Sequence, residues 1–382
     1  MVNKELLKHQ HICLIEDHYN PLGIVRSLGE VGIEPIILLT TKSPRMVNKS
    51  KYARNIYLFE DTHKAFEYMV KTYGNEVYKP FVYNGSDKTA LILDEHYKEL
   101  KDKFYFSNGR GGLKKYLNKY DITVLAEECG CDIPREELML RGQLPHNLRY
   151  PVITKAESST ILHWKEDSFI CDTPEQLKEA FSHIRSEKVL IQEFIKKENE
   201  YCIDGISING GDEIFMPYAA SYYRFSEKSY GAYMYFRPVL DESLIAKIKN
   251  IIQGASYSGI FCIEFLIGSD GKYYFLEVNF RNSGWSYAFT YGGYNLLYNW
   301  AISTLNNHID AERFKPINQF TAMSEFEDYQ MFVKSGELKL VDWMKDFKNS
   351  DCTFIYNKKD PKPFYSIMLG KVRRKLFRKQ RQ

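Results

Sequence analysis

The stretch of sequence that decides the fold is residues 259–284, Gly-Ile-Phe-Cys-Ile-Glu-Phe-Leu-Ile-Gly-Ser-Asp-Gly-Lys-Tyr-Tyr-Phe-Leu-Glu-Val-Asn-Phe-Arg-Asn-Ser-Gly. Two mainly apolar runs flank a Gly-Ser-Asp-Gly segment, whose residue types readily adopt turn conformations. This pattern predicts a β-hairpin. The first strand carries Glu264. The second carries Glu277 and Asn279, which are two residues apart and therefore lie on one face of the strand.

The three polar side chains of this hairpin predict a metal site. Carboxylate and amide oxygens are hard ligands that suit Mg²⁺, which keeps waters or phosphate oxygens in its other positions. The alternative is structural, because buried acids are costly without partners and Glu264 and Glu277 could pair with Arg281 or Lys272 instead. The order of features in the rest of the chain favours the metal interpretation.

The bulk composition is that of an ordinary globular protein. With 382 residues, 44% of them hydrophobic and 26% charged, the chain is long enough for two or three domains. Its apolar runs stay short of transmembrane length, and its first residues lack the apolar core of a signal peptide. The seven cysteines are scattered and odd in number, which favours reduced thiols and a cytoplasmic location.

The charge is distributed unevenly along the chain. Residues 371–382 hold seven bases and no acid, and the rest has 45 bases against 49 acids. A mildly acidic body argues against nucleic acid as a partner. The tail from Phe364 mixes bases with apolar residues, which suits either an amphipathic helix at an anionic membrane surface or a solvated tail.

The N-terminal part predicts an open α/β domain. Strand patterns at 11–16 and 35–39 flank a helical pattern at 22–28, which indicates a βαβ unit with parallel strands. Similar patterns continue to about residue 108. The unit lacks the G-x-G-x-x-G turn of dinucleotide-binding domains, so that class of cofactor is not expected.

The middle of the chain begins with helices and ends in a lysine-bearing strand. Helical patterns cover 113–120 and 121–129, with Asp121 as the cap of the second, and residues 135–148 are ambiguous. Lys155 ends a short strand and precedes a hydroxyl-rich loop at 156–160. Such a lysine can hold phosphates by charge, assisted by hydroxyl and loop N–H groups. The alternative is an exposed lysine at a strand end.

Between that loop and the hairpin lie further strands and a basic loop. A strand pattern at 189–195 stops in a polar segment that contains Glu200, and another strand begins at Tyr201. Residues 222–231 are a polar and aromatic loop that carries Lys228.

In this order, the features resemble the ATP-grasp superfamily, in particular its D-aspartate ligase-like carboxylate–amine ligases. The resemblance covers residues 10–305, and the Glu-x-Asn ending after the apolar hairpin is its most specific part. It implies a multidomain α/β and α+β architecture, in which an N-terminal α/β pre-ATP-grasp domain precedes a two-subdomain ATP-grasp fold. The implied parts are residues 1–110 (pre-ATP-grasp domain), 111–187 (small subdomain with a helical linker), 188–317 (large subdomain with the Mg-ATP site) and 318–382 (C-terminal extension with the basic tail).

The resemblance also implies a role for each candidate residue. ATP is expected between the two subdomains, with two Mg²⁺ ions, for which Mn²⁺ can substitute. Glu200 is expected to hold the ribose, and Lys228 to reach the γ-phosphate from its loop. An earlier ATP lysine is either Lys114 or Lys115, and the resemblance does not choose between them. The other implied contacts are Lys155, Ser158 and Ser159 at the phosphates, Gln192, Glu193, Phe194 and Ile195 at adenine, and Glu264, Glu277 and Asn279 at the metal.

The implied reaction joins a carboxylate to an amine through an acyl phosphate, with release of ADP. Arg281, Arg237 and Lys228 are implied to neutralise charge in the transition state. The sequence departs from the family pattern in two places. The loop after Lys155 has no glycine, and Cys262 stands where many of these ligases carry a base.

The resemblance leaves the substrates and the partners broad. It implies a small-molecule carboxylate, such as an amino acid or a dicarboxylate, and an amine, in cell-wall or surface-polysaccharide biosynthesis. The alternatives are a degenerate nucleotide-binding protein without turnover and a kinase that stops at phosphoryl transfer. The expected location is cytoplasmic, with peripheral attachment at the inner membrane face if the tail binds lipid. The oligomeric state stays open between a monomer and a homo-oligomer.

Overall fold

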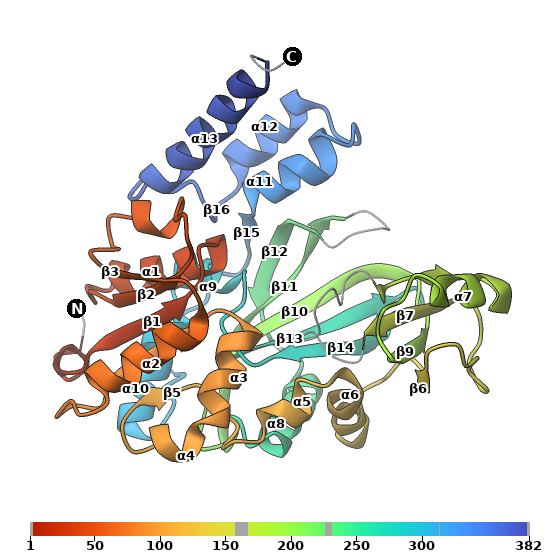
Figure 1. The fold of residues 1–382 in the computed structure, drawn as a ribbon, viewed down its shortest axis with the longest axis horizontal. Helices are drawn as coiled ribbons and strands as arrows, with labels where there is room; N and C mark the ends of the chain where they lie inside the picture. The colour runs from red at the N-terminus through yellow and green to blue at the C-terminus, as the bar shows by residue number, and fades with distance from the viewer. Residues whose placement is uncertain (1–2, 157–166, 226–230, 313, 380–382) are drawn as a thin grey trace.

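The computed structural model describes residues 3–156, 167–225, 231–312 and 314–379, and the side chains of its last helix up to Gly370. Three sheets and a C-terminal group of helices make up this part of the chain (Figure 1). Ser158, Ser159 and Lys228, expected at the phosphates, lie outside the described residues. Within those ranges, no helix is both long and apolar enough to cross a membrane.

The N-terminal domain is an open parallel sheet with helices on both faces. Its strand order is β3-β2-β1-β4-β5. Alternate residues of β1 enter two different cores: Cys13 packs in the cluster that contains α1, and Ile12 packs in the one that contains α2. The elements are β1 (His11–Ile15), α1 (Tyr19–Glu30), β2 (Ile36–Thr40), β3 (Asn55–Phe59), α2 (Thr62–Tyr73), β4 (Phe81–Asn84), α3 (Asp87–Glu95), α4 (Tyr97–Leu100) and β5 (Tyr105–Phe106), with 3-10 turns at Leu6–Lys8 and Val47–Lys49.

The second sheet is small and antiparallel, with strand order β6-β9-β7-β8. The ambiguous segment 135–148 contains one of its strands. The sequence places the boundary between the two subdomains at residue 187/188. Because β9 pairs with β6 and β7, the small sheet instead extends to Glu193. The elements are α5 (Leu113–Tyr116), α6 (Lys119–Glu128), β6 (Glu136–Leu140), β7 (Val152–Ala156), β8 (Ile170–Cys171), α7 (Pro174–Phe181) and β9 (Lys188–Glu193).

The third sheet forms the centre of the molecule and contains the predicted hairpin. Its order is β14-β13-β10-β11-β12-β15-β16. β11 continues to Arg224, so residues 222–224 are strand rather than the expected loop. The elements are β10 (Lys197–Ile208), β11 (Glu213–Arg224), β12 (Tyr233–Pro238), α8 (Glu242–Gly254), β13 (Gly259–Gly268), β14 (Tyr273–Asn279), α9 (Ser286–Tyr291), α10 (Leu296–Asn306), β15 (Phe320–Met323) and β16 (Cys352–Thr353).

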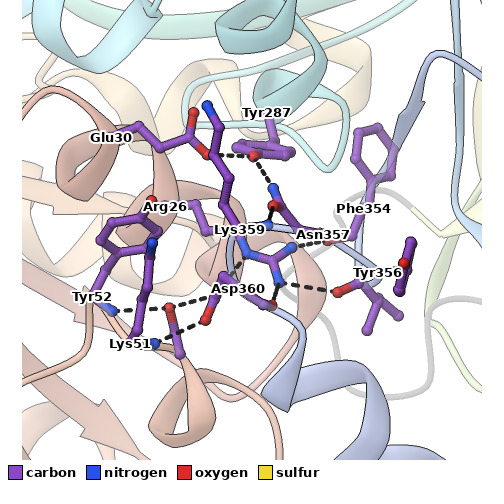
Figure 2. A network of polar contacts seen from close by, with 12 residues as sticks. Arg26, Glu30, Lys51, Tyr52, Tyr287, Phe354, Tyr356, Asn357, Lys359 and Asp360 are labelled. Atoms are coloured by element: carbon purple, nitrogen blue, oxygen red, sulfur yellow. Dashed lines mark hydrogen bonds and ion pairs between the residues drawn. The ribbon is translucent and has the colours of Figure 1, made fainter.

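The C-terminal segment is built into the molecule rather than appended to it. β15 and β16 complete the central sheet, while α12 and α13 project from the body (Figure 1). A fully buried arginine of α1, Arg26, donates from Nη1 to the Phe354 carbonyl (2.7 Å) and from Nε to the Asp360 carboxylate (2.9 Å), as Figure 2 shows. The helical elements are α11 (Glu325–Asp328), a π-helical segment (Tyr329–Val333), α12 (Leu340–Asn349) and α13 (Lys362–Lys379).

Candidate active site

One face of the central sheet collects acids at adjacent positions on three strands. Directly opposed residues in a sheet point to the same face, and residues two apart on a strand do so as well. The pairing of β10, β13 and β14 therefore places two rows side by side: Cys202, Glu264 and Glu277 in one, and Asp204, Cys262 and Asn279 in the next. The three predicted metal ligands are thus brought together.

The acids of this face are crowded and partly buried. Glu264 and Glu277 are direct cross-strand partners, and the amide nitrogen of Asn279 lies 3.1 Å from an oxygen of each. Burial, followed by the charges of Glu277 and Glu200, raises the pKa of Glu264 well above its ordinary value. Like charges that face each other destabilise a sheet unless a cation lies between them. The cluster could therefore hold a cation.

The donor chemistry fits Mg²⁺. Glu264 and Glu277 offer carboxylate oxygens, and Asn279 offers Oδ1 once its amide turns over. Donor atoms of Glu200, Cys202 and Glu264 also lie within 4.8 Å of one another. Burial raises the pKa of the Cys202 thiol well above its ordinary value, so Cys202 stays a neutral thiol and is a poor ligand for this hard ion.

Two lysines lie within electrostatic reach of these acids. The Lys155 ammonium donates to the Gln192 side-chain oxygen (2.7 Å). Burial, reinforced by the charge of Lys119, lowers the pKa of Lys155 to about 8, and Glu136, Glu277 and Glu200 oppose this shift. Burial also lowers the pKa of Lys119, against the charges of Glu277, Asp87 and Glu136. Two desolvated cations therefore converge on the acid cluster.

Lys119, which was not among the sequence candidates, is the lysine of this segment that lies within electrostatic reach of Glu277. The Lys115 ammonium is exposed and lies 5.1 Å from the centre of the Tyr116 ring, and that of Lys114 lies 3.9 Å from Glu95. Lys119 was not among the candidates because the expected helix began at residue 121, with Asp121 as its cap. Asn118, rather than Asp121, caps α6, so Lys119 is the first residue of that helix. An asparagine before a helical pattern is the signal that could have found it.

The residues expected around adenine run along β9 and just beyond it. Gln192 is buried and its side-chain nitrogen donates to Glu136 (2.6 Å), so its amide is engaged at both ends. The Glu193 carboxylate accepts from the Arg149 N–H (3.0 Å). The Phe194 N–H donates to the Pro151 carbonyl (2.8 Å), and Ile195 lies beside Gly268 at the end of β13. This stretch therefore links the small sheet to the central one.

Glu200 lies inside β10, at the edge of the acid cluster. Its carboxylate accepts from the Lys197 ammonium (2.9 Å) and from the Tyr222 hydroxyl. Burial, followed by the charge of Glu200, raises the pKa of Tyr222 far above its ordinary value. Glu200 thus lies between the segment 192–195, which is expected at adenine, and the row of Glu264, which is expected at the metal. A residue that contacts the ribose would lie between these two places.

Arg281 connects the acid cluster to a neighbouring cavity. Its Nη2 donates to the Asn279 side-chain oxygen (2.8 Å), and its Nε donates to Asp87 at the start of α3 (2.9 Å). The cavity has a volume of about 290 Å³. It is lined by the loop after β1 (His18–Asn20), the loop after β4 (Gly85–Asp87), Arg281 and Gly284.

Buried polar side chains hold the wall of this cavity in place. The Asn282 side chain donates to that of Asn20 (2.6 Å), which ties the loop after β14 to the N-terminal domain. Asp204 accepts from the Ser283 hydroxyl (2.5 Å) and from the Ser286 hydroxyl (2.7 Å). Sequence reasoning missed Asn20, Asp204 and Asn282, because their partners are far away along the chain.

Two other arginines, Arg237 and Arg224, lie away from the acid cluster. Arg237 lies opposite Ala219 on β11, and Ala219 lies opposite Ile203 on β10. Ala219 and Ile203 pack in the apolar cluster that contains α8, so the Arg237 side chain points to that face of the sheet and away from Glu264. The structure therefore does not bring Arg237 to the acid cluster, where its expected catalytic role would require it. Arg224 forms ion pairs with Asp328 (2.6 Å) and with Asp346, so it holds the C-terminal helices instead of a substrate.

The chain has the ATP-grasp fold, because solved structures of ATP-grasp ligases match most of its length. Among them are an L-amino acid ligase from Bacillus licheniformis (13% identity, 82% of this chain and 79% of that one, TM-score 0.62), an N5-carboxyaminoimidazole synthetase from Staphylococcus aureus (13%, 85% and 85%, 0.63) and a biotin carboxylase from Campylobacter jejuni (12%, 84% and 76%, 0.63). No protein-family model matches the chain, and no curated protein matches its sequence. The expected fold is confirmed.

Proposed function

We propose that this protein is an ATP-dependent carboxylate–amine ligase that forms an amide through an acyl phosphate and releases ADP. The observation that carries the proposal is the acid row of Glu264 and Glu277 within reach of two desolvated lysines, Lys119 and Lys155. A row of acids that holds Mg²⁺, opposed to cations that hold phosphates, suits phosphoryl transfer. The similar solved structures include an L-amino acid ligase and an N5-carboxyaminoimidazole synthetase, which supports the same assignment.

The cavity beside Arg281 suits a zwitterionic acyl substrate. It presents one guanidinium, Arg281, and one carboxylate, Asp87, which are 2.9 Å apart in the absence of substrate. A guanidinium binds a carboxylate through paired hydrogen bonds, and Asp87 can accept from an ammonium group. An amino acid that inserts between them would replace their mutual contact with two contacts of its own. We therefore propose an amino acid or a dicarboxylate as the carboxylate substrate.

The chain's own residues position the reactants and neutralise charge. Lys119 and Lys155 hold the phosphates of ATP, and Arg281 orients the substrate carboxylate toward the γ-phosphate. Glu264, Glu277 and Asn279 would hold Mg²⁺, which when bound would supply further charge neutralisation near the phosphates. An amine then attacks the acyl carbon and expels phosphate. No side-chain nucleophile is required, and the positioning groups perform most of the catalysis.

The C-terminal helices support an acceptor at a membrane surface. On α12 and on α13, exposed apolar residues recur at spacings that share one helix face. Seven bases follow in residues 371–382 without an acid, and apolar side chains with clustered bases favour anionic lipid. We extend the proposal to an amine acceptor of cell-wall or surface-polysaccharide synthesis, which sedimentation with anionic and neutral vesicles tests. The exposed residues are Leu340, Val341 and Met344 on α12 and Tyr365, Met368 and Leu369 on α13.

An ADP-release assay tests the ligase proposal. Mg·ATP is combined with a panel of carboxylates, including D- and L-aspartate, each with and without candidate amines. Turnover that needs both substrates and disappears in Glu277→Gln is expected. The exposed variant Glu76→Gln is the matched control and keeps its activity.

The other outcomes point to other functions. ADP release that needs only the carboxylate would indicate a kinase. Binding of Mg·ATP without turnover on the whole panel would favour a nucleotide-binding protein. Failure to bind Mg·ATP at all would contradict the site assignment itself.

A further inference from the structure

A second cavity lies at the opposite edge of the N-terminal sheet from the candidate active site. The loops after β1 and β4 line the substrate cavity, so that cavity is at the carboxyl ends of parallel strands. The second cavity, with a volume of about 240 Å³, is lined by Lys79, just before β4, and by Tyr105, the first residue of β5. These residues mark the amino ends of the strands. The two cavities are therefore separate sites.

The charges that line this cavity are all positive. Lys79, Lys101 and Arg110 contribute to its wall, and no carboxylate does. Lys101 and Arg110 form no ion pair with any residue that the structure describes. The Lys79 ammonium donates to the Lys101 carbonyl (2.6 Å), and Asp102, whose charge opposes the lowering of the Lys79 pKa by burial, lies outside the lining. Three cations around one hollow attract an anion.

A buried donor without a partner also belongs to this cavity. Trp300, on α10, lines it and is only 2% exposed, yet its indole N–H finds no hydrogen-bond acceptor within the described part of the chain. Leaving such a donor unpaired costs about 1–3 kcal/mol. Phe81 and Tyr83 pack edge-on against the indole ring, so packing holds the ring in place. The N–H is thus a buried donor, unsatisfied by the described residues, on a residue that lines the cavity.

The cavity is formed by parts of the chain that only the folded molecule brings together. Asn108 and Ser258 exchange backbone hydrogen bonds of 2.8 and 2.9 Å across it, which joins the N-terminal domain to the central sheet. Arg110, with φ at 55°, turns back toward the β10–β11 turn, where its Nη2 approaches the Asn209 carbonyl (3.4 Å). Tyr97 and Tyr105 supply flat apolar surface beside the cations.

We propose that this cavity is a second ligand site, which binds a small phosphate- or carboxylate-bearing metabolite. The lysines and Arg110 would hold the oxyanion, the Trp300 N–H would donate to it, and the tyrosines would contact the organic part. A volume of about 240 Å³ is just under the usual range for ligand pockets of about 300–1,000 Å³, so the ligand is small. Because the site joins two domains, a bound ligand stabilises their contact.

Calorimetric titration of the full chain at constant ionic strength tests this proposal, with inorganic phosphate, glycerol 3-phosphate and succinate as probes. Saturable binding of one equivalent is expected, and the preferred probe tells phosphate from carboxylate. Arg110→Gln and Lys101→Gln, both at exposed positions, are each expected to weaken binding by about tenfold or more. Trp300→Phe, which removes the N–H and keeps an aromatic ring, is expected to weaken it as well. Absence of saturable binding for all three probes overturns the proposal.

Two further arms separate this site from the candidate active site, where phosphate is also an expected product. Lys155→Met is expected to bind the probe as the unmodified protein does. If Lys155→Met loses probe binding while Arg110→Gln keeps it, the probe binds in the active site and the proposal is overturned. Nitrogen-15 labelling of the indole groups gives one signal for each of the four tryptophans, and Trp300→Phe assigns one of them. That signal is expected to shift with the bound probe. A signal that stays still while the probe binds would contradict the site.

Discussion

Single residues of the candidate site carry charges that are removed from water. Lys119 shows this for the cations: it is the first residue of α6, and burial lowers its pKa although Glu277 and Asp87 are near. A buried ammonium of this kind is available to ATP phosphates because the fold has already removed its hydration.

We expect Lys119→Met to raise the KM for ATP by about ten- to a hundredfold, since one charge-assisted phosphate contact is worth roughly 1.5–3 kcal/mol. Lys115→Met is the matched control at an exposed position four residues earlier, and it is expected to leave the KM unchanged. Steady-state kinetics and nucleotide titration measure both. An equal effect of the two variants would show that Lys119 has no special place at the phosphates.

Glu325, an acid outside the candidate site, is also buried away from water. It is fully buried and accepts from the Ile355 N–H (3.1 Å). Burial raises its pKa from 4.5 to about 7, against the hydrogen bonds and the charge of Arg26. The folded state therefore binds this proton more tightly than the unfolded state does. The stability that protonated Glu325 contributes is present below about pH 4.5 and is lost as the pH rises to about 7.

We expect Glu325→Gln to gain stability relative to the unmodified protein as the pH rises from 5 to 8. The difference is expected to reach up to about 3 kcal/mol and to level off above pH 7. Urea unfolding at several pH values measures it. The exposed variant Glu337→Gln is the control, and a pH profile of Glu325→Gln parallel to that of the control would refute the assignment.

At the scale of elements, the C-terminal segment is held to α1 by one buried ion pair. Arg26 and Asp360 are 0% and 1% exposed, and Asp360 also accepts from the Ser50 hydroxyl (2.7 Å). It accepts from the Lys51 N–H (2.8 Å) as well, and Figure 2 shows Lys51 beside Asp360. This arrangement joins α1, the turn before β3 and the segment between β16 and α13. Removing one partner leaves the other charge buried and unpaired.

We therefore expect Arg26→Met to lower the free energy of unfolding by about 3–5 kcal/mol. The control is Arg54→Met, which breaks an ion pair with Glu34 that is 69% and 60% exposed and is expected to cost at most about 1 kcal/mol. The double variant Arg26→Met/Asp360→Asn is expected to regain part of the loss. Denaturant unfolding of all variants measures these differences. Similar losses for Arg26→Met and Arg54→Met would mean that the buried pair does not anchor the segment.

At the scale of the whole molecule, the proposed magnesium site leads us to expect that cation binding and folding are coupled. Glu264 and Glu277 face each other across the hairpin, and Glu200 lies close to them on β10. Their repulsion acts on the central sheet, which every domain contacts through its helices or strands. A cation that binds only the folded state raises its stability by mass action.

We expect magnesium, added with ADP, to raise the melting temperature of the unmodified protein and to leave that of Glu277→Gln nearly unchanged. Before metal is added, Glu277→Gln is expected to melt roughly 2–4 °C higher, because one of the facing charges is gone. Thermal unfolding against a sodium control of equal ionic strength measures both effects. A lower melting temperature of metal-free Glu277→Gln would show that the acids are not in conflict.

The sequence by itself determined the local and periodic features of this protein. The hairpin of β13 and β14, with Glu264, Glu277 and Asn279 on one face, follows from an apolar alternation and a Gly-rich turn, which act over a few residues. The βαβ start and the ATP-grasp fold follow from the order of such elements. Lys155, Gln192 and Glu200 lie near this hairpin, as the order of the strands led us to expect.

Only the tertiary structure decided which distant residues share a site. Arg237 looked suitable along the chain, but strand register turns it to the α8 face, since a shift of one residue exchanges the two faces of a sheet. Lys119, Asp87 and Asn20 reach the site from other elements, so no spacing along the chain marks them. The burial that lowers the pKa of Lys155 to about 8 is likewise a property of packing between sheets. Sequence periodicity selects a face of each element, and packing selects what that face meets.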